Sequence, residues 1–151
     1  MKRKLLFLLF AVLFAVPSFA QKKDKEEKKK EMLEFKIEFL AKEMELRDDQ
    51  KKQFKEIYTQ MESERRAIFK KIKQAEKSIK GNKNATEADY DRASKEIAAA
   101  RNQMTQIENK YEAKFASFLS KKQIFKMKEA ETKFMETMRN CRDKKRSEQK
   151  K

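Results

Sequence analysis

A five-residue motif, Leu119-Ser120-Lys121-Lys122-Gln123, predicts the end of one helix and the start of another. Ser120 and Gln123 fit a capping box, in which the serine oxygen accepts the amide proton of the third helical residue and the glutamine reaches back to the amide of the cap. Leu119 and Ile124 stand at the two positions that a hydrophobic staple requires. The motif therefore predicts a helix junction and gives no sign of an active site.

A second copy of the motif, Leu46-Arg47-Asp48-Asp49-Gln50, lies earlier in the chain. It keeps Leu46 and Gln50 but has Arg47 where a capping serine or threonine would stand. Because arginine cannot accept a hydrogen bond, Asp48 is the better candidate for the N-cap. Apolar periodicity around the two motifs predicts four amphipathic helices, over about 31–46, 48–80, 87–118 and from the second motif to about 138.

The two middle helices should form a long antiparallel hairpin. Each is roughly 50 Å long, and only the short turn at Gly81 separates them. Reflection about that turn places the two motifs opposite each other at the open end. We expect an all-α fold, a hairpin flanked by two shorter helices. Because a thin hairpin buries little surface by itself, we also expect a second copy of the chain to complete the core.

The first twenty residues have the pattern of a cleavable signal peptide. A basic start is followed by a short apolar run and by small residues before a predicted cut between Ala20 and Gln21. We therefore predict export to a periplasm, without stable membrane insertion. The predicted organisation is a signal peptide over 1–20, a disordered basic lead-in over 21–30, one helical domain over 31–140 and a disordered basic tail over 141–151.

The composition argues against catalysis and metal binding. The chain has no histidine and one cysteine, Cys141, so the commonest general base and the usual soft-metal ligands are missing. Neither a Gly-rich phosphate loop nor a paired nucleophile is present. We predict no enzymatic activity, no catalytic residue, no metal site and no cofactor. Cys141 is either a lone thiol or an intermolecular link.

The formal net charge is +15, and the basic residues gather at both ends and in the second half of the second helix. This cluster is either a solubilising face or a surface that attracts acidic partners. Nucleic acid is an unexpected partner for an exported chain. The apolar face of the first helix is wider than a single narrow stripe because of Met32, Phe35 and Phe39. Phe125 and Met135 widen the apolar face of the last helix in the same way. The candidates for binding unfolded client proteins are Arg65, Arg66, Lys70, Lys71, Lys73, Lys77, Met32, Phe35 and Phe39.

The export signal, the small basic helical body and the paired L-[TS]-x-x-Q motifs resemble the Spy/CpxP family of periplasmic proteins, whose signature is a repeated LTxxQ motif. Leu119, Ser120 and Gln123 match the motif with serine for threonine, and Leu46 and Gln50 match it in part. The resemblance implies an interlocked, cradle-shaped homodimer that holds unfolded clients without ATP on a basic, partly apolar face. It also implies a role in envelope stress.

Two other functions remain open from the sequence. Some relatives in that family bind metal or restrain a sensor kinase, so the chain could be a stress-signalling adaptor for a kinase's periplasmic domain, or a metal-responsive accessory that restrains such a kinase. The absence of histidine weighs against the metal role. A chaperone of the Skp/OmpH type is also small, basic and helical. Such chaperones carry a β-rich trimerisation segment, and no stretch of this sequence has the pattern of a strand.

Overall fold

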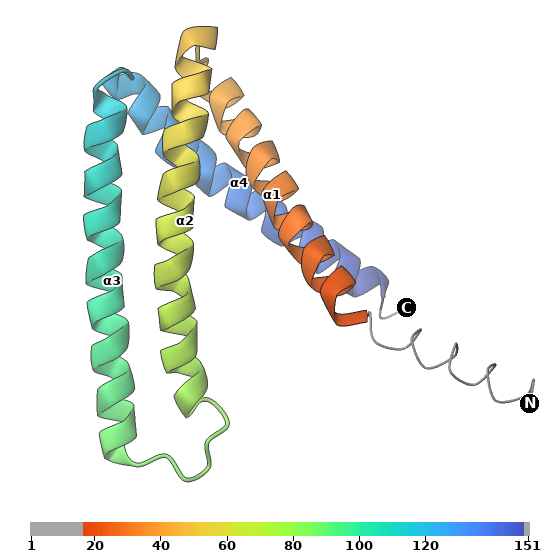
Figure 1. The fold of residues 1–151 in the computed structure, drawn as a ribbon, viewed down its shortest axis with the longest axis vertical. Helices are drawn as coiled ribbons and strands as arrows, with labels where there is room; N and C mark the ends of the chain where they lie inside the picture. The colour runs from red at the N-terminus through yellow and green to blue at the C-terminus, as the bar shows by residue number, and fades with distance from the viewer. Residues whose placement is uncertain (1–16, 150–151) are drawn as a thin grey trace, which may run out of the picture. The chain divides into compact units, whose positions relative to one another are not determined.

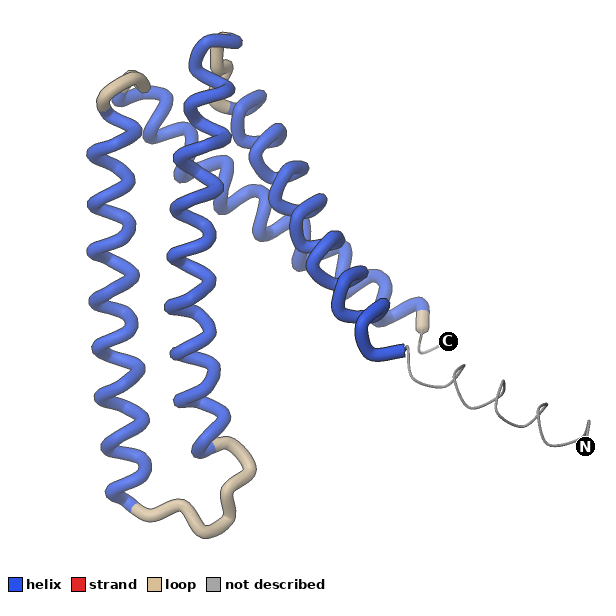
Figure 2. The backbone as a smooth tube through the Cα atoms, viewed as in Figure 1, coloured by secondary structure: helices blue, strands red, loops and turns tan. Residues whose placement is uncertain are grey.

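Every regular element that the structure describes is an α-helix (Figure 2). The computed structural model describes residues 17–149. The helices are α1 (Pro17–Glu43), α2 (Asp48–Ile79), α3 (Glu87–Ala116) and α4 (Lys121–Glu148). The predicted all-helical class is confirmed for this range. No helix within it is long and apolar enough to cross a membrane.

Two segments that we expected to be disordered belong to helices. Residues 21–30 lie within α1, and residues 141–148 lie within α4. Lysine and glutamate are good helix formers, so a charged sequence without apolar residues can still be helical. Pairs one turn apart support the start of α1, with Lys28 Nζ 2.8 Å from Asp24 and Lys29 Nζ 2.6 Å from Glu26. The predicted signal sequence lies outside the described residues except for its last four.

The chain divides into two compact units, with the boundary after Lys36. This differs from the single domain expected over 31–140. The first unit contributes most of α1. The second unit, from Ile37 onward, contains the end of α1 and the whole of α2, α3 and α4.

Within the second unit, α2 and α3 run side by side in opposite directions (Figure 1). Gly81 makes the turn between them with a φ of 88°, a backbone conformation that glycine adopts without steric cost. Thr86 then caps α3, because its hydroxyl accepts from the amide of Asp89 while the Asp89 carboxylate accepts from the amide of Thr86. The Thr86-x-x-Asp89 spacing of the sequence thus forms a capping box.

Aromatic rings fill the core at the motif end of this helix pair. Phe54, Tyr58 and Phe115 are fully buried. The centroid of Phe54 lies 5.2 Å from that of Tyr58 and 5.5 Å from that of Phe115. Toward the turn, the buried positions hold small side chains such as Ala75 and Ala93. The apolar core is therefore thickest beside the motifs. Tyr58 is part of this core, whereas its neighbour Ile57 is only half-buried.

The α4 helix packs through its own apolar face. Ile124, Met127, Ala130 and Phe134 are buried. The ring of Phe134 lies 5.6 Å from that of Phe39 near the end of α1. Ion pairs flank this contact, with Lys133 Nζ 2.9 Å from Glu43 and Lys126 Nζ 2.8 Å from Glu45.

Candidate functional site

The two motif copies meet through a pair of glutamine side chains. Gln50 Nε2 donates to Gln123 Oε1 at 3.3 Å, and Gln123 Nε2 donates to Gln50 Oε1 at 3.0 Å. Gln50 also donates to the carbonyl oxygen of Phe118 at 3.0 Å and accepts from the amide of Arg47 at 3.2 Å. Gln50 is buried. The junction thus links the start of α2 to the end of α3 and the start of α4.

The leucines of the motifs pack at the same junction. Leu46 and Leu119 are both buried. Leu46 completes a Schellman motif at the end of α1, since its amide donates to the carbonyl of Ala41 and the amide of Glu45 donates to that of Lys42. Glu45 adopts a φ of 54° there, in the left-handed region.

The cap of α2 differs from the expectation. Arg47, and not Asp48, is the N-cap, because its carbonyl oxygen accepts the first helical hydrogen bond from Lys51. The Arg47 side chain turns outward to Asp49, with 2.8 Å between Nη2 and the carboxylate. Gln50 therefore supplies the one side-chain hydrogen bond of this cap. At the second motif, the predicted capping box is confirmed by bonds of 3.0 Å and 3.2 Å between Ser120 and Gln123.

Arg65 is part of a polar network inside the helix assembly and is no exposed client-binding group. Its Nη1 atom lies 3.1 Å from Glu62 and 3.0 Å from Glu131, and its Nη2 atom lies 3.8 Å from Glu108. The hydroxyl of Tyr58 also donates to Glu131. Arg65 thus differs from the other predicted basic residues, because carboxylates from α2, α3 and α4 converge on it.

Burial and charge shape the ionisation of this network. Burial lowers the pKa of Arg65, but the nearby Glu131 and Glu62 outweigh that effect and leave the pKa above its usual value. Burial, followed by the charges of Glu131 and Glu62, raises the pKa of Tyr58 far above the ordinary range. Arg65 is thus held charged and Tyr58 neutral, so the network is a fixed structural element.

A second polar cluster joins α2 and α3 on another side. Glu64 accepts from the Tyr111 hydroxyl at 2.7 Å and from Lys110 Nζ at 2.7 Å. The hydrogen bonds from Lys110 and Tyr111 hold the pKa of Glu64 below its usual value. Burial, with the hydrogen bond to Glu64, raises the pKa of Tyr111 to about 12. Neither cluster was foreseen, because its members are far apart in sequence.

Four of the predicted basic residues form one exposed row on α2, which we call the α2 basic stripe: Arg66, Lys70, Lys73 and Lys77. Their 4-3-4 spacing places them along one side of the helix. Buried Ile68 and Ala75 lie on the other side, so the stripe faces away from the core. Lys71 is exposed but lies off the stripe, and its Nζ atom donates to Gln103 of α3 at 3.3 Å.

The predicted apolar candidates differ in exposure. Met32 and Phe35, in the unit that ends at Lys36, are exposed. Phe39 lies in the second unit, where it is half-buried against Phe134 with Lys133 Nζ 5.7 Å from its ring centroid. Phe39 therefore packs within the second unit, whereas Met32 and Phe35 are exposed.

Large apolar side chains are exposed directly after buried ones on two helices. Phe69 follows buried Ile68 on α2 and is 52% exposed. On α4, Phe125 follows buried Ile124 and is 64% exposed, and Met135 follows buried Phe134 and is 52% exposed. On both helices, the apolar face is therefore wider than the part that packs into the core, and its edge is exposed to solvent. Phe69 was not among the predicted binding residues, although the sequence places it directly after an apolar core position and between basic residues.

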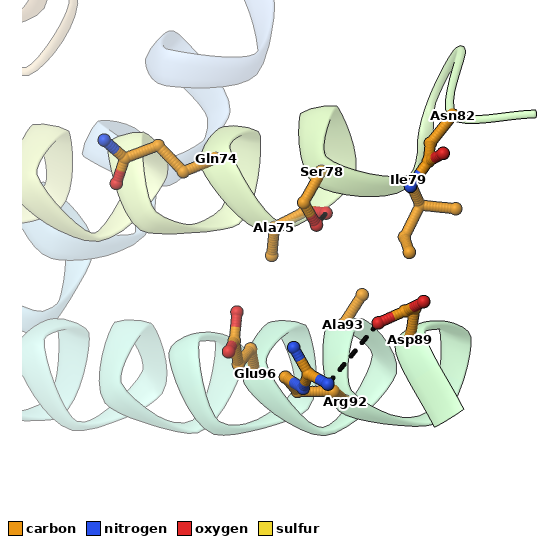
Figure 3. Close-up of a pocket in the computed structure, with 9 residues that line it drawn as sticks. All are labelled: Gln74, Ala75, Ser78, Ile79, Asn82, Asp89, Arg92, Ala93 and Glu96. Atoms are coloured by element: carbon orange, nitrogen blue, oxygen red, sulfur yellow. Dashed lines mark hydrogen bonds and ion pairs between the residues drawn. The ribbon is translucent and has the colours of Figure 1, made fainter. Parts of the chain in front are cut away.

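A shallow pocket of about 250 Å³ lies between the turn ends of α2 and α3 (Figure 3). Ala75 and Ala93 face each other across it, and Arg92 pairs with Asp89 at 3.4 Å at its edge. Its charged lining is of mixed sign, with Glu96 beside Arg92. The pocket is explained by the small side chains at this end of the helix pair and contains no set of groups suited to catalysis.

The described residues offer no arrangement suited to metal chemistry. Among them, no three acidic or cysteine side chains converge in a way that could hold a metal ion. Cys141 is an exposed free thiol on α4.

Comparison of the chain with protein-family models, with curated proteins and with solved structures gives no match. The exposed surfaces of the helices are therefore the candidate functional site.

Proposed function

We propose that this protein is a periplasmic, ATP-independent chaperone that holds unfolded polypeptides on its helical surface. The observation that carries the proposal is the exposure of Phe69, Phe125 and Met135 beside buried apolar residues. Unfolded chains present apolar segments, and burial of such segments against exposed apolar side chains is favourable. Methionine adds a flexible side chain that can adapt to varied partners.

Positive charge would assist the first encounter with a client. The α2 basic stripe adjoins Phe69, and Arg139 lies one turn beyond Met135 on α4. Long-range attraction accelerates association with acidic segments and weakens as salt screens it. The resemblance of the paired motifs to the Spy/CpxP family supports the same function, and the predicted export signal supports the location.

We further propose that two chains form an antiparallel dimer built from the long hairpin of α2 and α3. Toward the turn, the pair of helices buries only small side chains such as Ala75 and Ala93, so a second copy can add to its core. The mass of the protein in solution, measured by sedimentation equilibrium, should be that of a dimer. A trimer would favour the Skp/OmpH type of chaperone instead.

Binding of a permanently unfolded, fluorescently labelled polypeptide tests the chaperone proposal. The processed chain, purified after export, should bind it, and binding should slow at high salt. The double variant Phe125→Ser/Met135→Ser should bind about tenfold more weakly because two apolar contacts are lost. The variant Thr137→Ser/Asn140→Ser, on exposed polar positions of the same helix, is the matched control and should bind as the wild type does.

Two results would contradict the proposal. One is the absence of any binding to unfolded polypeptides. The other is capture of a single folded envelope protein by a chain that binds no unfolded polypeptide, which would identify a signalling adaptor for a sensor kinase.

A further inference from the structure

We propose that the α2 basic stripe, together with Phe69, binds the surface of an anionic lipid bilayer. The stripe consists of Arg66, Lys70, Lys73 and Lys77, all exposed. This inference does not rest on chaperone activity, because lipid binding needs no client.

The four cations of the stripe form no ion pair with a carboxylate of residues 17–149. In the part of the chain that the structure describes, no carboxylate lies within ion-pair distance of any of the four side chains. Other cations are paired, such as Arg65 with Glu131 and Lys110 with Glu64. Like charges one turn apart repel each other and destabilise a helix. A row of four such cations is therefore stabilised by an external anionic partner.

The geometry of the row suits a flat partner. The four residues lie along one side of a continuous helix over roughly 16 Å, at 1.5 Å of rise per residue. Because the core lies on the opposite side of α2, a planar surface can approach all four cations at once. Long lysine and arginine side chains can reach headgroup phosphates while the helix lies parallel to the bilayer.

Phe69 distinguishes a bilayer from a merely polyanionic partner. It lies three residues after Arg66 and four before Lys73, so it borders the stripe on the helix surface. Its ring is 52% exposed. An aromatic ring next to lysines can enter the boundary between headgroups and acyl chains, where apolar side chains and basic residues act together.

Charge variants test the stripe in a vesicle-binding assay. The processed protein should cosediment with vesicles of equal parts phosphatidylglycerol and phosphatidylcholine, and should not cosediment with pure phosphatidylcholine. The variant Lys70→Gln/Lys73→Gln/Lys77→Gln should lose roughly 100-fold in apparent affinity. The control Lys121→Gln/Lys122→Gln/Lys144→Gln removes the same charge from exposed positions of α4 and should change affinity less than threefold.

The absence of tryptophan from the chain allows a second test. Phe69→Trp places a single fluorophore at the edge of the stripe, and its emission should shift to the blue on anionic vesicles. Phe125→Trp, at an exposed position of α4, is the control and should not shift. Circular dichroism would verify that both variants keep the helical content of the wild type.

Four outcomes would overturn the inference. They are no binding of the wild type to anionic vesicles, equal loss of affinity in the two triple variants, equal blue shifts at positions 69 and 125, and no shift at position 69 in a protein that binds. Preferential binding to nucleic acid or to an acidic protein, with vesicles left unbound, would show that the stripe recognises another kind of polyanion.

Discussion

Gln50 is the one polar side chain that the described core buries. Its amide nitrogen donates to Phe118 and Gln123, and its amide oxygen accepts from Arg47 and Gln123. These hydrogen bonds link the start of α2 to the end of α3 and to the start of α4. Removal of this amide costs more than its own hydrogen bonds, because half-buried Gln123 and the carbonyl of half-buried Phe118 each lose a hydrogen bond.

Gln50→Ala should lower the free energy of unfolding by about 1–3 kcal/mol, because Gln123 and the Phe118 carbonyl lose their partner. Gln123→Ala should have a similar effect, and the double variant should cost less than the sum of the two. Urea unfolding measures all three. Gln53→Ala, on an exposed position of α2, is the control. Strict additivity would show that the two side chains do not act together.

Arg65 and Arg66 are neighbours with opposite roles, which makes them a matched pair for a stability measurement. Arg65→Ala should destabilise the protein by roughly 3 kcal/mol, because half-buried Glu62 and Glu131 lose their ion pairs with Arg65. Arg66→Ala, on the exposed stripe, should change stability by less than about 0.5 kcal/mol. Equal effects in urea unfolding would contradict the distinction between network and stripe.

Tyr111 should ionise with a pKa of about 12, above its ordinary value of 10, because it is buried and bonded to Glu64. Its neutral form is favoured in the folded state. The stability that this gives is therefore complete below pH 10 and is lost as the pH rises from 10 to 12. Tyr58→Phe/Tyr90→Phe leaves Tyr111 as the sole tyrosine, and its tyrosinate absorbance gives the midpoint. A midpoint near 10 would contradict the burial of the hydroxyl.

The sequence predicts those side-chain contacts that join residues a few positions apart in the chain. The capping boxes at Ser120 and Thr86 follow from spacing alone, and both are present. Arg65, unlike Arg66, occupies the slot between Met61 and Ile68 on the apolar face of α2. Its network could not be predicted, because Glu108 and Glu131 come from other helices. Phe39 and Phe35 likewise differ only in what packs against them.

The helices begin and end for local reasons, and their ends are where backbone strain is found. Glu45 ends α1 with a φ of 54°, and Gly81 follows α2 with a φ of 88°. The same left-handed conformation is occupied by a residue with a Cβ atom in one case and by glycine in the other. A side chain there costs free energy that glycine avoids.

Opposite shifts in melting temperature are therefore expected from two substitutions. Glu45→Gly should raise the melting temperature by about 2–5 °C, because it relieves the strain at the end of α1. Gly81→Ala should lower it by a similar amount, although nothing within 4 Å of Gly81 would contact the new methyl group. Thermal unfolding followed by circular dichroism measures both. Shifts of the same sign would contradict a conformational cause.

The start of α1 and the end of α4 are helical although their amino-acid composition predicted disorder. Low hydrophobicity and high charge favoured disorder at 21–30 and 141–151. Intrinsic helix propensity and ion pairs one turn apart favour a helix instead, and the structure has helices at 21–30 and up to Glu148. The bounds of α2 and α3 were predicted within two residues because caps and a glycine mark them.

The chain divides into two units, and the side chains proposed to bind partners lie on exposed helix surfaces and not in a cavity. The four-helix count and all-helical class were predictable from periodicity. The unit boundary after Lys36 was not, because no proline or glycine marks it in sequence. The exposure of Phe69, Phe125 and Met135 also needed the structure, since spacing alone cannot tell how wide a face the neighbouring helices cover.

Suppression of aggregation is the most direct test of the proposed chaperone function. An unrelated enzyme is diluted from denaturant, without ATP, into buffer containing the processed protein, and light scattering is followed. We predict suppression at equimolar or lower amounts of dimer, with weaker suppression by Phe125→Ser/Met135→Ser and unchanged suppression by Thr137→Ser/Asn140→Ser. Undiminished scattering at several-fold molar excess of the protein would contradict the proposed function.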